Sequence, residues 1–290
     1  MILHTIDTGF FKLDGGAMFG VVPKSIWNKL NPADANNLCT WALRCLLIED
    51  RNRLILIDTG IGNKQDEKFF SHYYLQGEHG LDDSLQSKGF NRKDVTDVFL
   101  THLHFDHCGG AIVRQEGKLL PAFPNAIYWS NPAHWAWATE PNEREKASFL
   151  KENILPIQES GQLQMLPVKG NDKADNVNQL IKLPFAEGFS IRLTDGHTNS
   201  MMLPQLTYKE KTIVFMADLL PSTGHLPIPY IMAYDMFPLT SLREKKVFLD
   251  EALAEDFILF FEHDPIHECC SLQKTEKGIR AKEFFKLKDL

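Results

Sequence analysis

Residues 95–110 read VTDVFLTHLHFDHCGG, an apolar run that passes directly into a cluster of histidine and aspartate. The stretch from Val95 to Leu100 is typical of a buried strand, and Gly109-Gly110 indicates a turn after the cluster. The cluster places three imidazoles and one carboxylate within the six residues from His102 to His107. Such a concentration of ligand chemistry at the end of a strand indicates a functional site rather than a solvated loop.

The spacing within this cluster suits metal ions. Residues i and i+2 of an extended chain point to the same side, roughly 7 Å apart along the backbone, so His102 and His104 can reach one ion. Asp106 and His107 lie where the chain turns and can serve a second, adjacent ion. Neutral imidazole and carboxylate are the usual ligands of zinc, and they also suit iron or manganese.

Three further residues with ligand chemistry follow strand-like runs elsewhere in the chain. His197 lies just past an alternating apolar run, Asp218 ends a second run, and His263 follows a third. Because functional groups gather at the ends of strands in open sheets, we expect these side chains to belong to the same site as the histidine cluster.

The apolar runs form two groups that are separated by helical stretches, which predicts one α/β domain over residues 1–290. Strands are expected at 42–48, 54–57, 95–100, 189–193, 202–208, 212–216 and 256–261. Hairpins are expected to join 42–48 to 54–57 and 202–208 to 212–216. Helices are expected at 81–88, from Pro132 after an Asn131 cap, at 143–154 ahead of Pro156, and at 241–254 with Thr240 or Ser241 as cap. The economical architecture is an αββα sandwich, in which two mixed sheets pack face to face with helices outside.

Composition narrows the class of partner. Charged residues make up 24% and the net charge is -7, without a basic cluster, so nucleic acid is not expected as a partner. No apolar run reaches membrane-spanning length, and the segment from Met1 to Asp7 lacks a targeting pattern. The five cysteines have no disulfide spacing, which favours reduced thiols and a cytoplasmic protein.

With these motifs together, the chain resembles the metallo-β-lactamase superfamily. The His-x-His-x-Asp-His signature matches residues 102–107, and the later Gly-His matches Gly196-His197. The bridging aspartate matches Asp218, the final histidine matches His263, and the leading Asp-Thr-Gly matches residues 58–60. The resemblance extends from about residue 40 to 265, and it implies the αββα fold.

The resemblance also implies two divalent metal ions. It assigns one ion to His102, His104 and His197, the other to Asp106, His107 and His263, with Asp218 between the two. Asp58 is expected to orient a ligand from behind. Zinc is the metal we expect first, and Mn²⁺, Fe²⁺ and Co²⁺ also suit these ligands.

The function implied is that of a metal-dependent hydrolase acting on a small molecule. The dinuclear centre would activate a bridging hydroxide that cleaves an ester or lactone bond, with Asp106 and Asp218 as catalytic residues. The segments Met18–Trp27 and Asp58–Gly62 are similar to the lactonase and methyl parathion hydrolase branch. A phosphotriester hydrolase is the alternative. From another class, a mononuclear iron sulfur dioxygenase is a further alternative, although the complete second ligand set argues against it.

Two departures from the family pattern bear on the substrate. Many relatives read Gly-His-Thr-Pro-Gly-His where this chain has Asn199-Ser200-Met201 after Thr198. Acyl-homoserine lactonases carry a tyrosine three residues after the bridging aspartate, and this chain has Pro221 there. The substrate of that group therefore does not transfer directly to this chain.

The segment Pro221–Pro238 is rich in proline and methionine, which predicts an irregular loop. His225, Tyr230 and Phe237 are expected to line the substrate pocket from this loop, unless the segment only covers a sheet edge. An aromatic-rich helix between Trp129 and Trp137 is a candidate surface for a homodimer.

Overall fold

The computed structural model describes residues 1–77, 80–168, 180–183 and 187–290. The chain divides into two compact units, of which the first comprises residues 1–9 and 43–170 and the second residues 10–42 and 171–290. The single domain over residues 1–290 stays a prediction.

The first unit is built on a mixed sheet with the strand order β1-β2-β3-β4-β7-β8. These strands are β1 (Ile2–Asp14), β2 (Leu38–Asp50), β3 (Arg53–Ile57), β4 (Asp97–Phe99), β7 (Ile127–Ser130) and β8 (Leu163–Met165). Residues 10–14 of β1 and 38–42 of β2 belong to the second unit. β2 and β3 form the expected antiparallel hairpin, in which Leu47 faces Leu56. β3, β4, β7 and β8 pair in parallel, so the ends of β3 and β4 lie at the same edge.

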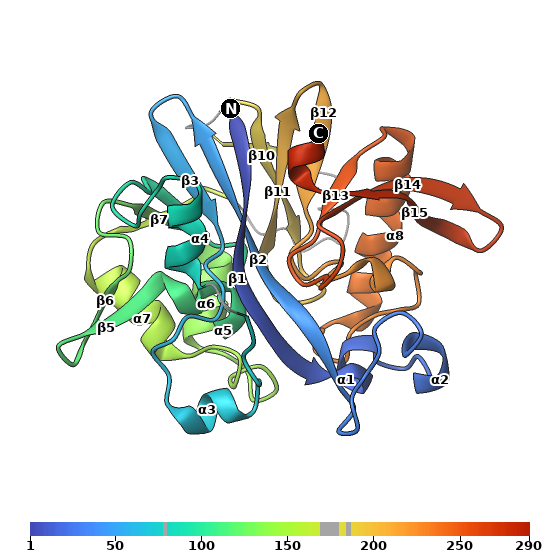
Figure 1. Ribbon diagram of the computed structural model, residues 1–290, viewed down its shortest axis with the longest axis horizontal. Coiled ribbons are helices and arrows are strands. Elements are labelled where there is room, and N and C mark those ends of the chain that lie inside the picture. The colour runs from blue at the N-terminus through green and yellow to red at the C-terminus, as the bar shows by residue number, and fades with distance from the viewer. Residues whose placement is uncertain (78–79, 169–179, 184–186) are drawn as a thin grey trace. The chain divides into compact units, whose positions relative to one another are not determined.

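Helices and one small hairpin complete the first unit. They are α3 (Glu67–Ser71), α4 (Leu81–Ser87), α5 (Phe105–Cys108), η1 (Gly109–Ala111), β5 (Ile112–Gln115), β6 (Lys118–Pro121), α6 (Pro132–Thr139) and α7 (Lys151–Glu159). Figure 1 shows α4 to α7 gathered beside β3 and β7. The expected helix at 81–88 is confirmed by α4, and the expected cap is confirmed because Asn131 Oδ1 accepts a hydrogen bond from the His134 amide at 2.9 Å.

The prediction of a helix over 143–154 is wrong in its bounds. Residues 143–148 form turns, because the Asn142 side chain accepts from the amides of Arg144 and Glu145. The helix α7 begins at Lys151 and continues through Pro156 to Glu159. Proline inside a helix costs one backbone hydrogen bond, but Ile154, Pro156 and Ile157 are all buried, and this packing offsets the cost.

The core of the first unit is a nearly continuous apolar layer. Leu46, Leu47 and Ile48 on β2 are completely buried, as are Leu56 and Ile57 on β3. Consecutive buried residues mean that both faces of these strands are covered, which explains why their sequence is apolar throughout rather than alternating.

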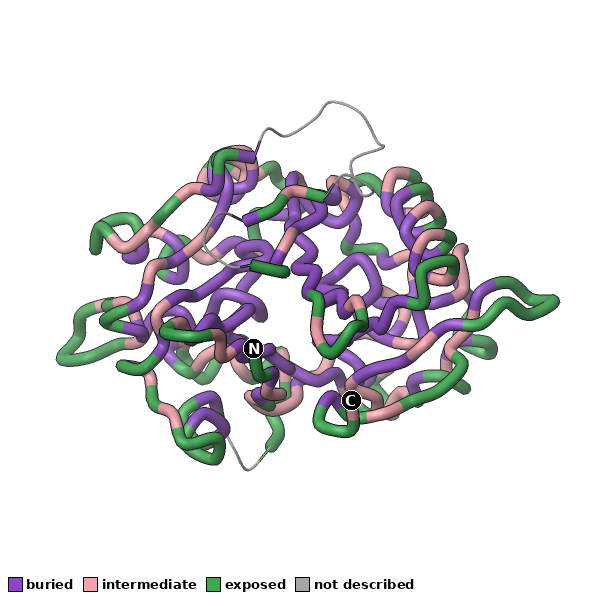
Figure 2. Tube along the Cα trace, turned by 90° about the horizontal axis from the view of Figure 1, so that it is seen from above, coloured by how far each residue is buried: buried purple, intermediate pink, exposed green. Residues whose placement is uncertain are grey.

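The second unit contains a mixed sheet with the order β15-β14-β13-β12-β11-β10-β9. Its strands are β9 (Ile181–Lys182), β10 (Phe189–Thr194), β11 (Met201–Tyr208), β12 (Lys211–Phe215), β13 (Ile258–Phe260), β14 (Cys269–Thr275) and β15 (Gly278–Phe285). β12 and β13 pair in parallel and the other neighbours are antiparallel. The tip of the β14–β15 hairpin is exposed and shows as green at the right of Figure 2.

The expected hairpin between β11 and β12 is confirmed. Lys209 and Glu210 form its two-residue turn with φ angles of 47° and 63°, a left-handed pair that matches the twist of the flanking strands. The hairpin of β14 and β15 was not expected, because its exposed polar residues hide the alternation.

The remaining helices of the second unit are α1 (Gly15–Phe19), α2 (Lys24–Trp27), η3 (Thr223–His225), α8 (Pro238–Ala254) and η4 (Leu287–Asp289). α8 lies beside β14 and β15 (Figure 1). It begins at Pro238, so the predicted cap at Thr240 or Ser241 is wrong. Proline is well placed in a first turn because its fixed φ suits the helix and its missing N–H is not needed there.

None of the helices in the described ranges combines the length and apolarity needed to cross a bilayer. The five cysteines are all buried and free of disulfide bonds.

Candidate metal centre

The histidine cluster of the first unit lies where β4 ends and α5 begins. The loop that follows β3 runs against it, since the amide of Thr59 donates to the His107 carbonyl at 2.8 Å and that of Gly110 donates to the Gly60 carbonyl at 2.9 Å. A Cβ on Gly110 would lie 2.2 Å from the Thr59 carbonyl oxygen, and one on Gly109 would lie 2.1 Å from that of Ile61. The Gly-Gly pair therefore permits the close approach that fixes the ligand loop.

His102 and His104 face each other within this loop. Thr101 Oγ1 donates to Asp58 at 2.6 Å, so it accepts from His102 Nδ1–H at 3.1 Å and leaves the lone pair on His102 Nε2. His104 Nε2–H donates to Glu145 at 2.9 Å and leaves the lone pair on His104 Nδ1. These two ligand nitrogens lie 3.0 Å apart. Two facing lone pairs repel each other unless a cation or a proton lies between them, so the pair suits a metal ion.

Asp58 organises the other half of the cluster. Its carboxylate is completely buried, accepts the Thr101 amide at 2.8 Å, and accepts His107 Nδ1–H at 3.1 Å. His107 Nε2 then carries the lone pair and lies 3.8 Å from Asp106 Oδ2. The structure thus brings Asp58 into contact with one predicted ligand directly and with His102 through a hydroxyl.

In the second unit, Asp218 lies between two histidines. One carboxylate oxygen lies 3.1 Å from His197 Nε2 and the other lies 3.2 Å from His263 Nε2. The outer nitrogens are fixed by acceptors, because His197 Nδ1–H donates to Asp235 at 2.9 Å and His263 Nδ1–H donates to the Ala42 carbonyl at 2.8 Å. All three side chains are buried, and the carboxylate has the two-sided geometry of a bridging ligand.

The loop that carries His197 is held from α8 and from the segment before it. Glu244 accepts the amides of Asp195 at 2.7 Å and Gly196 at 3.0 Å. The amides of Met236 and Phe237 donate to the carbonyls of His197 and Gly196. Burial raises the pKa of Glu244 to about 7, against the opposing effect of the two amides it accepts. The loop is therefore fixed by backbone contacts that do not involve the imidazole.

Electrostatics in the second unit favour a positive charge. Burial alone lowers the pKa of His197, but Asp218 and Asp235 outweigh it and raise that pKa to about 10. Carboxylates that hold a proton on a buried imidazole so firmly also suit a cation in its place. The donors of each unit, nitrogen and carboxylate oxygen without sulfur, fit a divalent ion such as zinc.

Two residues that contact predicted ligands were missed from the sequence. Glu145 is almost completely buried and holds His104 as well as Trp137 Nε1, the latter at 2.6 Å. Asp235 holds His197 from an irregular loop. A lone acidic residue far along the chain from its histidine gives no periodic or motif signal, so only the fold identifies these contacts.

The three expected substrate-pocket residues lie in the second unit but differ in exposure. His225 is buried, stacks on Phe19 at 4.5 Å, and bonds to Ser222 Oγ at 2.8 Å and the Met18 carbonyl at 2.9 Å. Tyr230 packs edge-on against Phe19, and Phe237 is 47% exposed. The hydrogen bonds of His225 are those of a packed interior residue, and a role for the three in binding substrate stays a prediction.

A protein-family model described as the metallo-beta-lactamase superfamily matches residues 44–263, more than half of the chain. The chain therefore belongs to the metallo-β-lactamase superfamily and has its fold, as the motifs indicated.

Individual relatives include lactonases. An N-acyl homoserine lactonase of Bacillus cereus is 27% identical over 142 residues, which are 46% of this chain and 50% of the relative. One from Bacillus thuringiensis is 30% identical over 96 residues, 30% of this chain and 37% of the relative. The chain thus matches half the length of these curated relatives or less.

Solved structures match over nearly the whole chain. A probable metal-dependent hydrolase from Staphylococcus aureus has a TM-score of 0.85 at 26% identity, covering 98% of this chain and 96% of that one. A dizinc quorum-quenching lactonase has a TM-score of 0.76 at 22% identity, covering 98% and 95% respectively. At 22% identity, the similarity to the dizinc lactonase shows that the two chains share a fold and nothing more.

Proposed function

We propose that this protein is a metal-dependent hydrolase that cleaves an ester or lactone bond of a small molecule. The observation that carries the proposal is Asp218, whose two carboxylate oxygens face His197 Nε2 and His263 Nε2 at 3.1 and 3.2 Å. A buried carboxylate that contacts an imidazole nitrogen through each of its oxygens is the arrangement expected of a ligand shared by two metal ions. The kinship with lactonases supports the choice of bond.

The proposed ligand sets combine residues of both units. In this proposal His102, His104 and His197 would hold one ion, Asp106, His107 and His263 would hold the other, and Asp218 would serve as a ligand to both. Within each unit the tautomers agree with these roles, because each histidine gives its outer N–H to a fixed acceptor. Zinc is the proposed metal, since nitrogen and carboxylate ligands predominate.

When bound, two such ions lower the pKa of water towards neutrality and polarise the bond under attack. The chain's own residues supply the rest. Asp218 keeps the imidazoles of His197 and His263 turned inward. Asp106 lies beside His107, is only 8% exposed, and accepts or returns the proton that the reaction moves.

Recognition of the substrate is proposed to differ from that in relatives with a tyrosine near the bridging aspartate. Pro221 has no hydroxyl to donate to a carbonyl or leaving group. We therefore propose an ester or lactone whose recognition does not depend on such a hydrogen bond. The buried, free thiols further support a reducing compartment, for which we propose the cytoplasm.

The test is hydrolysis by the purified, metal-loaded protein. An acyl-homoserine lactone, an aryl ester and an aryl phosphotriester are assayed before and after treatment with a chelator. We expect turnover of the lactone or the aryl ester, its loss with the chelator, and its return with zinc.

Variants distinguish the site from general damage. His102→Ala and Asp218→Ala are expected to lower kcat at least a hundredfold, whereas His72→Ala, at an exposed histidine outside the site, leaves it unchanged. Turnover of the phosphotriester alone would favour the alternative hydrolase. Full activity in a folded Asp218→Ala protein would overturn the proposal.

A further inference from the structure

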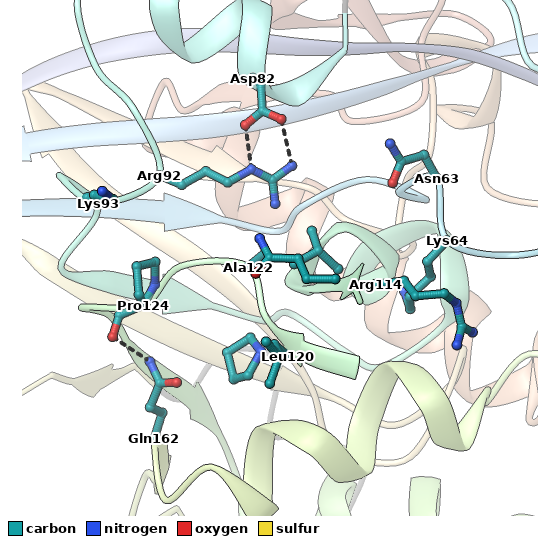
Figure 3. Close-up of a pocket in the computed structure, with 13 residues that line it drawn as sticks. Asn63, Lys64, Asp82, Arg92, Lys93, Arg114, Leu120, Ala122, Pro124 and Gln162 are labelled. Carbon is teal, nitrogen blue, oxygen red and sulfur yellow. Dashed lines mark hydrogen bonds and ion pairs between the residues drawn. The ribbon is translucent and has the colours of Figure 1, made fainter. Parts of the chain in front are cut away.

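The first unit contains a pocket of about 900 Å³ to which no predicted metal ligand contributes. It lies between the loop after β3, the start of α4, the turn before β4 and the β5–β6 hairpin (Figure 3). The lining residues are Asn63, Lys64, Asp82, Arg92, Lys93, Val113, Arg114, Gln115, Leu120, Pro121, Ala122, Pro124 and Gln162. Its volume falls within the range of small-molecule sites, roughly 300–1,000 Å³.

The charge of this pocket is opposite to that of the whole chain. Lys64, Arg92, Lys93 and Arg114 line it beside a single carboxylate, Asp82, although the chain carries a net charge of -7. Arg92 is paired with that carboxylate through two nitrogens, one of them at 3.0 Å, and also lies 5.5 Å from the Phe123 ring centroid. This ion pair fixes Arg92 and engages Asp82, which is the one carboxylate among the lining residues. Lys64, Lys93 and Arg114 therefore line the pocket without a lining carboxylate as partner.

Lys64 is the most informative of these cations because it is only 7% exposed. Its Nζ donates to the Gly109 carbonyl, and among the residues that the structure describes no carboxylate lies within 4.0 Å of it. Burial lowers the pKa of Lys64 to about 8; the charge of Glu152 opposes this shift, and the charge of Arg114 acts in the same direction as burial. Figure 3 shows Lys64 and Arg114 at the same end of the pocket. Two cations at one end of a pocket attract an anionic group, and the burial of Lys64 strengthens that attraction.

Part of the pocket lining is apolar. Val113, Leu120 and Pro121 from the β5–β6 hairpin line it, with Ala122 and Pro124 beyond. Leu120 is 40% exposed, so its apolar surface is accessible to a ligand in the pocket. A ligand for this pocket therefore needs both a negative group and an apolar body.

We propose that this pocket binds a small organic anion, with a carboxylate or phosphate group between Lys64 and Arg114 and an apolar chain against Leu120 and Pro121. Arg114 supplies a forked guanidinium that matches either anionic group, and Lys64 supplies a buried point charge. The proposal stands apart from the hydrolase, because it uses none of the ligands or catalytic residues.

Calorimetric titration of the metal-loaded protein tests the proposal. The probes are hexyl phosphate, hexanoate, inorganic phosphate and hexanol, which separate the anionic group from the apolar chain. We expect hexyl phosphate or hexanoate to bind, inorganic phosphate to bind more weakly, and hexanol not to bind. The stronger of the two amphiphilic probes identifies the anionic group.

A matched pair of variants locates the binding. Arg114→Gln removes a cation that lines the pocket, and Lys118→Gln removes an exposed cation from the same hairpin outside it. Arg114→Gln is expected to weaken the better probe about tenfold, the loss of one charge-assisted hydrogen bond, and Lys118→Gln less than twofold.

Lys93→Gln serves as a second pocket variant at an exposed position, with an expected loss of a few fold. Equal losses in the Arg114 and Lys118 variants would mean a diffuse surface charge and would overturn the proposal. Binding that neither pocket variant weakens would place the probe at the metal ions instead and would also overturn it.

Discussion

At the scale of single residues, the site is defined by which nitrogen of each histidine is held. His197, His263, His104 and His107 each give one N–H to a fixed acceptor. The other ring nitrogen of each is then the one that a metal ion would bind. The acceptors are carboxylates in three cases and a backbone carbonyl for His263. Carboxylate partners also make the imidazole a stronger ligand.

Asp235→Asn tests whether the carboxylate of Asp235 strengthens His197 as a metal ligand. The amide keeps an oxygen acceptor but loses the charge, so we expect metal affinity to fall by about ten- to a hundredfold. Competition for the ion against a chromophoric chelator measures the change. Asp250→Asn, on the exposed face of α8, is the control and is expected to leave affinity unchanged. Equal affinity in both variants would show that Asp235 does not support the ligand.

His225 predicts a pH dependence of stability. Burial lowers its pKa to about 3, so the folded chain does not take up the proton that the unfolded chain binds below about pH 6.5. The unfolded state gains protons first, and folding stability therefore falls as pH decreases from 6.5 towards 3.

Between pH 7 and pH 5 this single group is expected to remove about 2 kcal/mol of stability, at 1.36 kcal/mol per pH unit below 6.5. Urea denaturation of wild type and His225→Gln across this range gives the difference in slope. The variant is less stable at neutral pH because it loses the stack on Phe19, but its stability should change less with pH. Parallel curves would contradict a neutral, buried His225.

At the scale of elements, the sequence predicted two hairpins correctly but missed other strands, including β1 and the β14–β15 hairpin. The β2–β3 and β11–β12 hairpins were recognisable because apolar runs were interrupted by short polar turns. The helix α7 was misplaced because Pro156 was expected to stop it, whereas its buried neighbours outweigh the lost hydrogen bond. At such positions tertiary packing outweighs the intrinsic helix preference of a residue, and a local sequence pattern does not reveal that packing.

The cap of α6 links an element to the site. Asn131 caps the helix through the His134 amide, and His134 Nε2 accepts the Leu103 amide at 2.9 Å inside the ligand loop. Asn131→Ala is expected to lower the free energy of unfolding by about 1–2 kcal/mol, because a buried amide loses its acceptor. Asn131→Ser keeps an acceptor and should recover most of the loss. Urea denaturation compares the two, and equal losses would show that the hydrogen bond does not stabilise the helix.

At the scale of the whole molecule, the family could be predicted from the sequence because the expected metal ligands come in a dense motif and at the ends of strands. The seven predicted ligands divide into a set of four in the first unit and a set of three in the second, and each set is buried and internally consistent. Residues that support the ligands, such as Glu145 and Asp235, could not be predicted, since they act across long sequence separations and have no motif. The basic pocket was also hidden, because its cations are dispersed between Lys64 and Arg114 in an acidic chain.

The proposed function requires that the two ligand sets together would hold two divalent ions, with Asp218 as a ligand to both. Elemental analysis of purified protein, alongside Asp218→Ala of confirmed fold, tests it most directly. We predict close to two equivalents of metal in the wild type, with zinc foremost, and at most one in the variant. A folded wild type that binds no metal, or a variant that keeps both equivalents, would contradict the claim.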